Sequence, residues 1–378
     1  MRVKRAKSVD TKTIKKVTKL LKQQTLSGFN AGTGPSYFGG PYVQKLENKF
    51  QSYFKVKHAI SVNSWTSGLH IAVNCLDIRP GSEIICSPWS MSATVASIVN
   101  NGCVPVFADI DLKTFNIDPN EIIKKITRKT KAILYTDMYG QSADVTNINK
   151  IAKKYNLYTI SDGAQAIGST LRNQFTSTFA DIGGFSFNWH KHLDCGEGGM
   201  VVTNNNDLAR KMKMLRNHSE THGYKFGHNY RMTEMCAVIV LGQLPKLKKF
   251  IRDREKIVDL LRRHTNFSVH FPKILKTHTH SYCSLPLFID NHNCRDMMYD
   301  KLKDQYPVTN TFSRGPLNKL KLCKPFYKKM PNAEKLDKHL LDIDLSYDYT
   351  PNDLVRIATI INTCIEKCIS KHDNALRT

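Results

Sequence analysis

The sequence predicts an α/β protein with two domains: a large domain built on a mainly parallel seven-stranded sheet, and a smaller C-terminal α+β domain. The chain has 378 residues, 41% of them hydrophobic, so it is long and apolar enough to bury two cores. Between residues 57 and 205, short apolar runs rich in β-branched residues alternate with helical patterns, as in strand–helix units. After residue 245 the pattern changes to a long helical stretch followed by shorter strands and helices.

Seven apolar runs are expected to form the large sheet: His58–Val62, Glu83–Cys86, Pro105–Asp109, Ala132–Thr136, Leu157–Ser161, Ile182–Phe187 and Met200–Thr203. Helices are expected between and after them: Ser67–Leu76, Ala93–Asn101, Asn120–Ile126, Val145–Tyr155 and Asp207–Leu215. Ligand sites in such sheets gather at the carboxyl ends of the strands. Ser64 and Thr66 follow the first strand and Asp162 and Gln165 follow the fifth, so this edge is the predicted site.

The C-terminal part of the chain is expected to be a domain of its own. A helix over Met232–Leu244 precedes a long helical stretch that ends near Arg263, and further elements are expected around Ser281–Phe288 and Asp353–Lys367. We therefore predict a large domain over residues 1–245, including the N-terminal segment, and a small domain over residues 246–378.

Composition excludes several classes of protein. The net charge of +24 and pI of about 9.6 would suit a nucleic-acid partner, but the basic residues are spread along the chain without a helix-turn-helix, zinc finger or RNA-binding motif. We expect a lysine-rich surface and no nucleic-acid partner. No window approaches ~18 consecutive apolar residues, and the basic N-terminus has no apolar stretch behind it, which predicts a cytoplasmic protein without a membrane partner. The ten cysteines form no C-x-x-C pair, which favours reduced thiols and no metal site.

The segment from Ser186 to Gly199 (S-F-N-W-H-K-H-L-D-C-G-E-G-G) carries the most specific chemistry. It places Lys191 downstream of Asp162, which ends a predicted strand in the run S-D-G-A-Q-A. A lysine can hold the aldehyde of pyridoxal phosphate as a Schiff base, and an aspartate beside the ring nitrogen keeps that nitrogen protonated. The pair therefore predicts a pyridoxal-phosphate enzyme in which Lys191 and Asp162 are the catalytic residues.

The ordered motifs resemble the DegT/StrS family of pyridoxal-phosphate-dependent sugar aminotransferases from about Gly39 to Ile361. Lys191 matches the family pattern S-F-x-x-x-K-x-x-x-x-G-E-G-G, and Gly227–Met232 (G-H-N-Y-R-M) matches its G-x-N-Y-R-M signature. The resemblance implies the aspartate aminotransferase fold, known as fold type I, and pyridoxal 5′-phosphate as cofactor, with pyridoxamine phosphate as its aminated form. His replaces the lysine in relatives that dehydrate sugars at C3, so Lys191 argues against that reaction.

The resemblance also assigns residues to the cofactor. Thr66, Ser67 and Ser186 match phosphate ligands, although Trp65 stands where the family more often has Gly. Asn229 matches a residue that reaches the phosphate of the neighbouring subunit, which implies a homodimer with shared active sites. Gln165 and two further side chains are expected around the ring: Gln165 by its hydroxyl, and Met91, in register with the family, or else Trp89 over its free face.

On the substrate side, Arg231, His192 and Arg314 are the expected contacts, with Arg314 placed to meet a pyrophosphate. The resemblance implies transfer of an amino group from L-glutamate to a nucleotide-linked 4-keto-6-deoxyhexose, with UDP or dTDP preferred and GDP as an alternative. The product would be a 4-amino-4,6-dideoxy sugar for glycan biosynthesis. Three alternatives stay open: a 3-keto-sugar aminotransferase, a pyridoxal-phosphate-dependent sugar 3-dehydratase and, most remotely, a basic nucleic-acid-binding protein.

Overall fold

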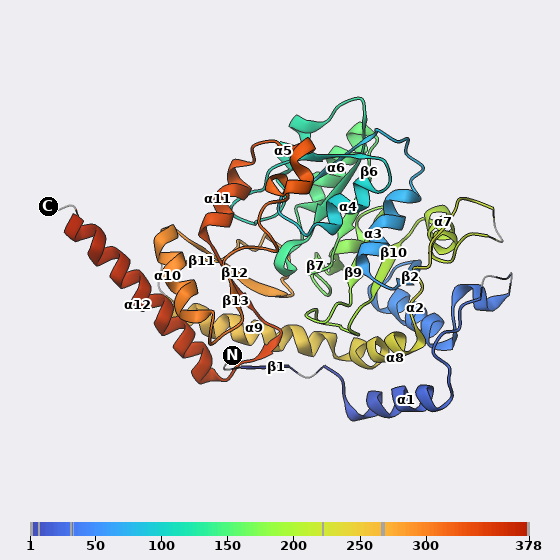
Figure 1. The fold of residues 1–378 in the computed structure, drawn as a ribbon, viewed down its shortest axis with the longest axis horizontal. Helices are drawn as coiled ribbons and strands as arrows, with labels where there is room; N and C mark the ends of the chain where they lie inside the picture. The colour runs from blue at the N-terminus through green and yellow to red at the C-terminus, as the bar shows by residue number, and fades with distance from the viewer. Residues whose placement is uncertain are drawn as a thin grey trace.

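The computed structural model describes residues 3–6, 8–30, 32, 34–220, 223–265 and 269–375. Its centre is a seven-stranded sheet in the order β2-β10-β9-β6-β5-β3-β4 (Figure 1). The strands are β2 (His58–Val62), β3 (Glu83–Cys86), β4 (Val104–Phe107), β5 (Thr130–Thr136), β6 (Tyr158–Asp162), β9 (Ile182–Ser186) and β10 (Gly199–Thr203). Only β10 pairs antiparallel to its neighbours, so the mainly parallel sheet predicted from the sequence is confirmed.

Helices cover both faces of this sheet, and its strands are therefore buried on both sides. In β3, Ile84 packs in one core with α3 (Trp65–Asn74), α4 (Ala93–Val99) and α7 (Asn206–Arg216), while its neighbour Ile85 packs in another core with α6 (Val145–Tyr155). Successive side chains of a strand point to opposite faces, so an apolar run without polar alternation is the expected pattern here. The other helices of this part are α2 (Pro41–Phe54), α5 (Pro119–Lys125) and α8 (Glu234–Gln243).

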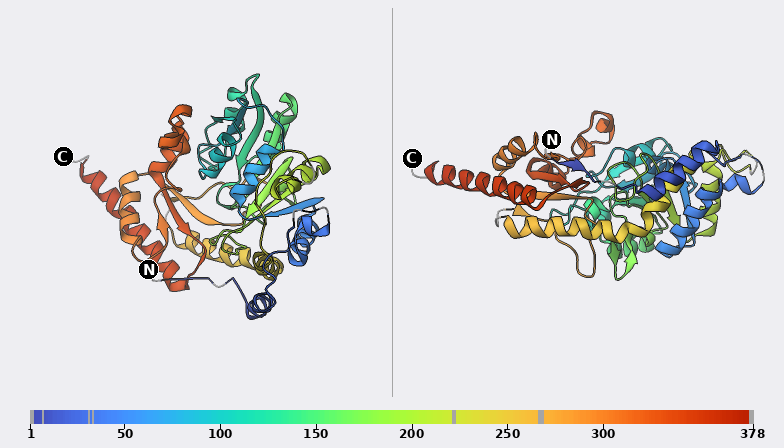
Figure 2. Two further views of the ribbon diagram at one scale, coloured as in Figure 1. Left: turned by 45° about the vertical axis from the view of Figure 1, so that its right-hand side comes forward. Right: turned by 90° about the horizontal axis from the view of Figure 1, so that it is seen from below.

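A second, four-stranded antiparallel sheet lies in the C-terminal part, in the order β11-β12-β14-β13. Its strands are β11 (Val269–His270), β12 (Ser284–Ile289), β13 (Val308–Thr309) and β14 (Leu340–Asp344), with the helices α10 (His292–Leu302), α11 (Pro331–His339) and α12 (Pro351–Ala375). Helix α9 (Leu247–His264) joins the two parts, since Leu247 belongs to a core beside the large sheet and Val258 to the core of the small one. Figure 2 shows α12 extending beyond the rest of the small sheet and its helices.

The N-terminal segment bridges the two parts of the molecule. Strand β1 (Lys4–Arg5) pairs antiparallel with β15 (Tyr347–Asp348), and Val3 belongs to the core of the small domain. Helix α1 (Thr11–Lys22) instead packs on α8 of the large domain (Figure 1). The division between residues 245 and 246 stays a prediction. The N-terminal residues 3–5 were predicted to belong to the large domain, but they pack with β15 and the core of the C-terminal part.

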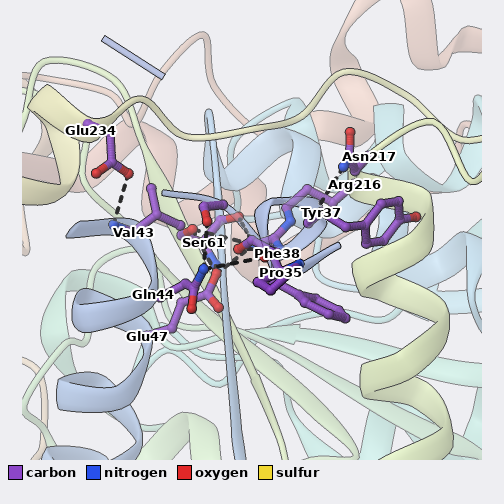
Figure 3. Close-up of polar contacts among 11 residues, drawn as sticks. Pro35, Tyr37, Phe38, Val43, Gln44, Glu47, Ser61, Arg216, Asn217 and Glu234 are labelled. Atoms are coloured by element: carbon purple, nitrogen blue, oxygen red, sulfur yellow. Dashed lines mark hydrogen bonds and ion pairs between the residues drawn. The ribbon is translucent and has the colours of Figure 1, made fainter. Parts of the chain in front are cut away.

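A buried polar network anchors the chain before α2 to the end of α7 (Figure 3). The Arg216 guanidinium, which has no exposed surface, donates to Glu47 Oε1 at 2.5 Å and to the Ser61 carbonyl at 3.0 Å. Ser61 donates to the same Glu47 oxygen from both its backbone N–H and its hydroxyl, each at 2.9 Å. Next to it, Asn217 donates to the carbonyls of Asn30 and Tyr37. The charge of Glu47 is therefore compensated within the fold.

In the described part of the chain, no helix combines the length and apolar character needed to cross a membrane.

Candidate active site

Lys191 lies in the loop that joins β9 to β10, at the carboxyl end of the large sheet. Its backbone N–H donates to the Asn188 carbonyl at 2.9 Å, which closes a turn over residues 188–191. The half-buried side chain lines two cavities. One, of about 470 Å³, is shared with Gln165 and with residues of the small domain from 307 to 313. The other, of about 460 Å³, is shared with His192, Arg254 and the N-terminal segment. Lys191 therefore lines cavities that also involve the N-terminal segment and the C-terminal part of the chain.

Asp162 is the last residue of β6 and is almost fully buried. Its Oδ1 accepts hydrogen bonds from the indole Nε1 of Trp65 at 2.7 Å and from the backbone N–H of Ala164 at 3.1 Å. Burial raises the pKa of Asp162 above its usual value, against these two donors and the charge of Lys191, which lower it. The charge of Lys191 therefore acts on the Asp162 carboxyl, and the predicted catalytic roles of the two residues stay predictions.

Gln165 lies in the buried turn that follows Asp162, and the oxygen of its side-chain amide is hydrogen-bonded. Its Oε1 accepts from the backbone N–H of Tyr139 at 2.6 Å, which orients the side chain so that the amide nitrogen is the remaining donor. Gln165 also lines the cavity next to Lys191. This arrangement suits the predicted contact with a ring hydroxyl.

The predicted phosphate ligands lie at the N-terminus of α3 and at the end of β9. Ser64 caps α3 by accepting from the Ser67 backbone N–H at 3.1 Å, and the two hydroxyls lie 2.9 Å apart. Thr66 is exposed in the first turn, and the Ser186 hydroxyl accepts from the Asn188 backbone N–H at 3.2 Å. A helix N-terminus with hydroxyls beside it is a favourable place for an anion.

The structure argues against Trp89 as the cover of a ring. Trp89 is fully buried in the core, and its indole donates to the Tyr139 hydroxyl at 3.0 Å. Met91 is 49% exposed, so its side chain, unlike that of Trp89, is accessible to a bound ring. Its sulfur accepts from the Ala93 backbone N–H at 3.2 Å. Met91 remains the predicted cover, and the alternative from sequence is corrected because the Trp89 ring packs inward.

The segment with Asn229 and Arg231 lies directly beside the loop before α3. The Asn63 backbone N–H bonds to the Tyr230 carbonyl at 2.9 Å, and the Asn63 amide donates to the Asn229 carbonyl at 3.2 Å. Arg231 donates from Nε to Asn229 Oδ1 at 2.9 Å, so its guanidinium orients this side chain. Within one chain, Arg231 therefore holds the side chain of Asn229 in place. The predicted contacts of Arg231 with the substrate and of Asn229 with a phosphate stay predictions.

His192 lines a cavity but is bonded within the fold, and its predicted contact with the substrate stays a prediction. It is 3% exposed, and its Nε2 lies 2.6 Å from the Ser281 carbonyl, to which it donates. Burial lowers the pKa of His192 well below its usual range, so the ring is neutral at neutral pH. Beside it, Arg254 donates to the carbonyls of Tyr282 and Cys283, each at 3.1 Å. His192 and Arg254 fix the Lys191 loop to the small domain, and sequence reasoning missed this because its partners lie far along the chain.

Arg314 is exposed next to the cavity rather than in its lining. Phe312 and Ser313 line the cavity beside Lys191, whereas the next residue, Arg314, is exposed and is not among its lining residues. The predicted contact with a pyrophosphate stays a prediction.

Comparison with known proteins identifies the family. The model of the DegT/DnrJ/EryC1/StrS aminotransferase family matches residues 22–362. The chain belongs to this family. It is therefore an aminotransferase, as the motifs around Lys191 predict, and the resemblance stated from sequence is confirmed.

Two curated relatives and one solved structure illustrate the similarity. The chain is 35% identical over 306 residues to the GDP-perosamine synthase of Escherichia coli O157:H7, covering 79% of this chain and 83% of the relative. It is 31% identical to the dTDP-3-amino-3,6-dideoxy-α-D-galactopyranose transaminase of Aneurinibacillus thermoaerophilus, covering 86% and 91%. Helicobacter pylori PseC, an aminotransferase involved in the biosynthesis of pseudoaminic acid, superimposes with a TM-score of 0.86 at 26% identity, covering 96% and 100%. The expected fold type is confirmed.

Proposed function

We propose that this chain is a pyridoxal-phosphate-dependent aminotransferase that moves an amino group from L-glutamate to a nucleotide-linked 4-keto-6-deoxyhexose. The observation that carries the proposal is the placement of Lys191 beside a cavity, with its charge acting on the buried carboxylate of Asp162. A buried acid next to a lysine at the end of a parallel sheet is the arrangement that a cationic ring and its aldehyde require.

The residues present fit pyridoxal phosphate. The capped N-terminus of α3 with Thr66 and Ser67, together with Ser186, would hold the phosphate, and Gln165 would donate to the ring hydroxyl. The carboxylate of Asp162 would face the ring nitrogen, because burial without a fully compensating cation favours binding of a positive group. When bound, the cofactor supplies an electron sink for proton removal next to the transferred nitrogen.

Each catalytic residue would then have its own role. Lys191 would hold the cofactor through its aldehyde, and its amine would carry a proton at the substrate carbon. Asp162 would keep the ring nitrogen protonated by ion pairing. His192 and Arg254 link the loop of Lys191 and helix α9 to the carbonyls of residues 281–283.

The relatives favour an acceptor with a keto group at C4, and a guanosine diphosphate sugar should be tested first. Three curated relatives, at 35%, 31% and 38% identity, are named GDP-perosamine synthase, which names a 4-amino sugar. UDP and dTDP sugars stay in the test because the nucleotide contacts would come from loops such as the one with Arg314. A second candidate, amination at C3, is favoured by the relative that is named a dTDP-3-amino sugar transaminase.

The test is a visible absorption spectrum of the purified protein with added pyridoxal phosphate, followed by L-glutamate and then by GDP-, UDP- or dTDP-linked 4-keto-6-deoxyhexose. We expect glutamate to bleach the band and one sugar to restore it, with an aminated product by mass. A product that has lost its 3-hydroxyl and gained no nitrogen would instead identify a dehydratase. No change with glutamate would contradict the proposal.

Lys191→Ala is the decisive variant. We expect it to lose the absorption band and to reduce turnover by at least about 10³-fold, because it removes both the attachment point and the proton carrier. Lys248→Ala, which changes an exposed lysine on α9, serves as the matched control and should behave as wild type. Normal turnover in Lys191→Ala would refute the assignment.

A homodimer with shared sites is part of the same proposal. If Asn229 serves the cofactor of the neighbouring subunit, inactive Lys191→Ala and Asn229→Ala proteins should regain activity when they are mixed and allowed to exchange subunits. In a mixed dimer, one of the two sites would then contain neither substitution. Persistent inactivity of a mixture that contains mixed dimers by mass would show that each site is built from one chain.

A further inference from the structure

Trp65 is the residue at which this chain departs from the phosphate loop of the family, and its side chain is buried next to Asp162. It is the first residue of α3 and is 4% exposed. A Cβ added to Gly68 would lie 2.5 Å from the indole ring, and one added to Gly184 would lie 2.0 Å from it. At Gly199 a Cβ would lie 2.7 Å from the backbone nitrogen of Trp65. Gly68 and Gly184 therefore leave the space in which the indole lies, and Gly199 lets β10 approach the backbone of Trp65 closely.

The indole N–H makes one short hydrogen bond to a buried carboxylate. Its Nε1–H donates to Asp162 Oδ1 at 2.7 Å, in a region where both partners are buried. Hydrogen bonds to an ionised carboxylate are shorter and stronger than those between neutral groups. The Ala164 backbone N–H donates to the same oxygen at 3.1 Å. Two donors on one oxygen hold the plane of the carboxylate in place.

We propose that Trp65 is a positioning residue for Asp162: its indole N–H fixes Oδ1, so that Oδ2 is the oxygen that meets the ring nitrogen of the cofactor. This inference rests on the proposed function, since it concerns the residue that would face that nitrogen. A phenylalanine would keep an aromatic ring in this space but would be smaller and would lack the donor, so a control that removes another buried indole is needed to separate positioning from packing.

The indole also acts on the charge of Asp162. Burial is the largest influence on this carboxyl and raises its pKa, while the hydrogen bonds from Ala164 and Trp65 lower it. Without the indole donor, the acid would hold its proton to a higher pH and the cofactor would have to bind a protein with a neutral Asp162. Loss of Trp65 should therefore weaken cofactor binding most at the acidic end of the pH range.

The first experiment reads the hydrogen bond directly, with or without cofactor. The chain has three tryptophans, so ¹⁵N-tryptophan labelling of the full-length protein gives three indole N–H signals, and Trp65→Phe assigns one of them. We expect the Trp65 signal to lie downfield and to titrate with a midpoint above the usual range for an aspartate. The pH dependence should vanish in Asp162→Asn, which keeps an acceptor oxygen but cannot ionise.

A Trp65 signal that is insensitive both to pH and to Asp162→Asn would overturn the inference. If Trp65→Phe fails to fold, the wild-type titration and its loss in Asp162→Asn still decide the question. Because this measurement needs no cofactor, its outcome is independent of whether the proposed function is correct.

The second experiment measures the affinity of pyridoxal phosphate as a function of pH in wild type and Trp65→Phe. We expect binding to weaken by about 10–100-fold at neutral pH, as for loss of a hydrogen bond to a charged group, and the deficit to shrink as the pH rises. Trp89→Phe is the matched control, because it removes a buried indole that donates at 3.0 Å to the neutral Tyr139 hydroxyl. It should destabilise the fold without a pH-dependent loss of affinity.

The outcomes separate the two proposals. Equal affinity in wild type and Trp65→Phe, or an equal loss at every pH, would refute the positioning role and leave the proposed function untouched. Failure of the wild-type chain to bind pyridoxal phosphate at any pH would refute the proposed function, whatever the indole signal shows.

Discussion

Glu47 and Asp162 are both buried carboxylates, but the molecule compensates their charges in different ways. Glu47 has a buried arginine, Arg216, as its partner and two further donors from Ser61 (Figure 3). Asp162 has dipolar donors from Trp65, Ala164 and Thr94, and the half-buried Lys191 acts on it as a cation from a distance. Since a buried charge is costly unless it is paired, the first arrangement holds the fold together and the second favours a cationic ligand.

Asp162→Asn should give the largest effect and should separate catalysis from stability. We expect turnover to fall by about 10³-fold or more, because a neutral amide does not stabilise a charged ring nitrogen. The cofactor-free protein should unfold at the same denaturant concentration as wild type or a higher one at neutral pH. Burial raises the folded-state pKa of Asp162, so this group destabilises the fold as the pH rises from its unfolded value through its folded value.

Denaturation with urea and steady-state assays on the same preparation would check both parts. Loss of stability in Asp162→Asn comparable to that from breaking the Glu47 pair would contradict the comparison, since both carboxylates would then be structural.

Glu47→Gln is the opposite case and should mainly affect stability. It leaves the Arg216 guanidinium buried without its counter-ion, which typically costs about 3–5 kcal/mol in the free energy of unfolding. Turnover per folded molecule should change little. The double variant Glu47→Gln/Arg216→Met should lose less than the sum of the single variants, because the partner charge is removed as well. Additive losses would show that the pair is not coupled.

Asp137, at the end of the neighbouring strand, allows a sharper test of how burial without a cationic partner affects a carboxyl group. It follows β5, is fully buried, and accepts from the Ala143 backbone N–H at 2.8 Å and the Ser161 hydroxyl at 3.0 Å. Burial, the largest influence, raises the pKa of Asp137 to about 7. The folded state therefore binds more protons than the unfolded state between about pH 4 and pH 7, and stability falls as the pH rises through this window.

In Asp137→Asn this part of the pH dependence should disappear. The free energy of unfolding at pH 4 minus that at pH 8 should be smaller than in wild type by roughly 2–4 kcal/mol, which urea titrations at the two pH values would measure. An unchanged pH dependence would show that Asp137 is ionised in the fold at all these pH values.

Lys124→Ala should give the smallest effect. Lys124 pairs with Glu121 on the surface of α5 at 2.5 Å, with 65% and 27% of the two side chains exposed. Exposed ion pairs contribute little because water screens them, so we expect the melting temperature to shift by no more than about 2 °C. A larger shift, measured by calorimetry, would mean that the distinction between buried and exposed pairs does not hold in this protein.

Much of the large domain was predictable because its local patterns agree with its fold. The strands His58–Val62 and Glu83–Cys86 and the helix Val145–Tyr155 have the boundaries expected from sequence. Asp162 was predictable in place as well, since the carboxyl end of a parallel strand points to the ligand edge. Here the apolar runs and helical periods are long enough for local signals to decide.

Side chains whose partners lie far along the chain were not predictable. Trp89 and Met91 were alternatives until the core packing showed Trp89 to be buried against Tyr139. His192 lines a cavity beside Lys191, but its hydrogen-bond partner Ser281 is 89 residues further on and could not be found from the sequence. Sequence spacing carries no signal for such contacts.

The sequence by itself determined the alternation of strands and helices, and it predicted a site with Lys191 and Asp162 at the carboxyl edge of the sheet, because periodicity and motif spacing are local properties. The tertiary structure decided the burial of Asp162, the pairing of Glu47 with Arg216 and the hydrogen bond from Trp65. These depend on which distant segments pack together, since burial and the donors around a carboxylate set its charge and its role.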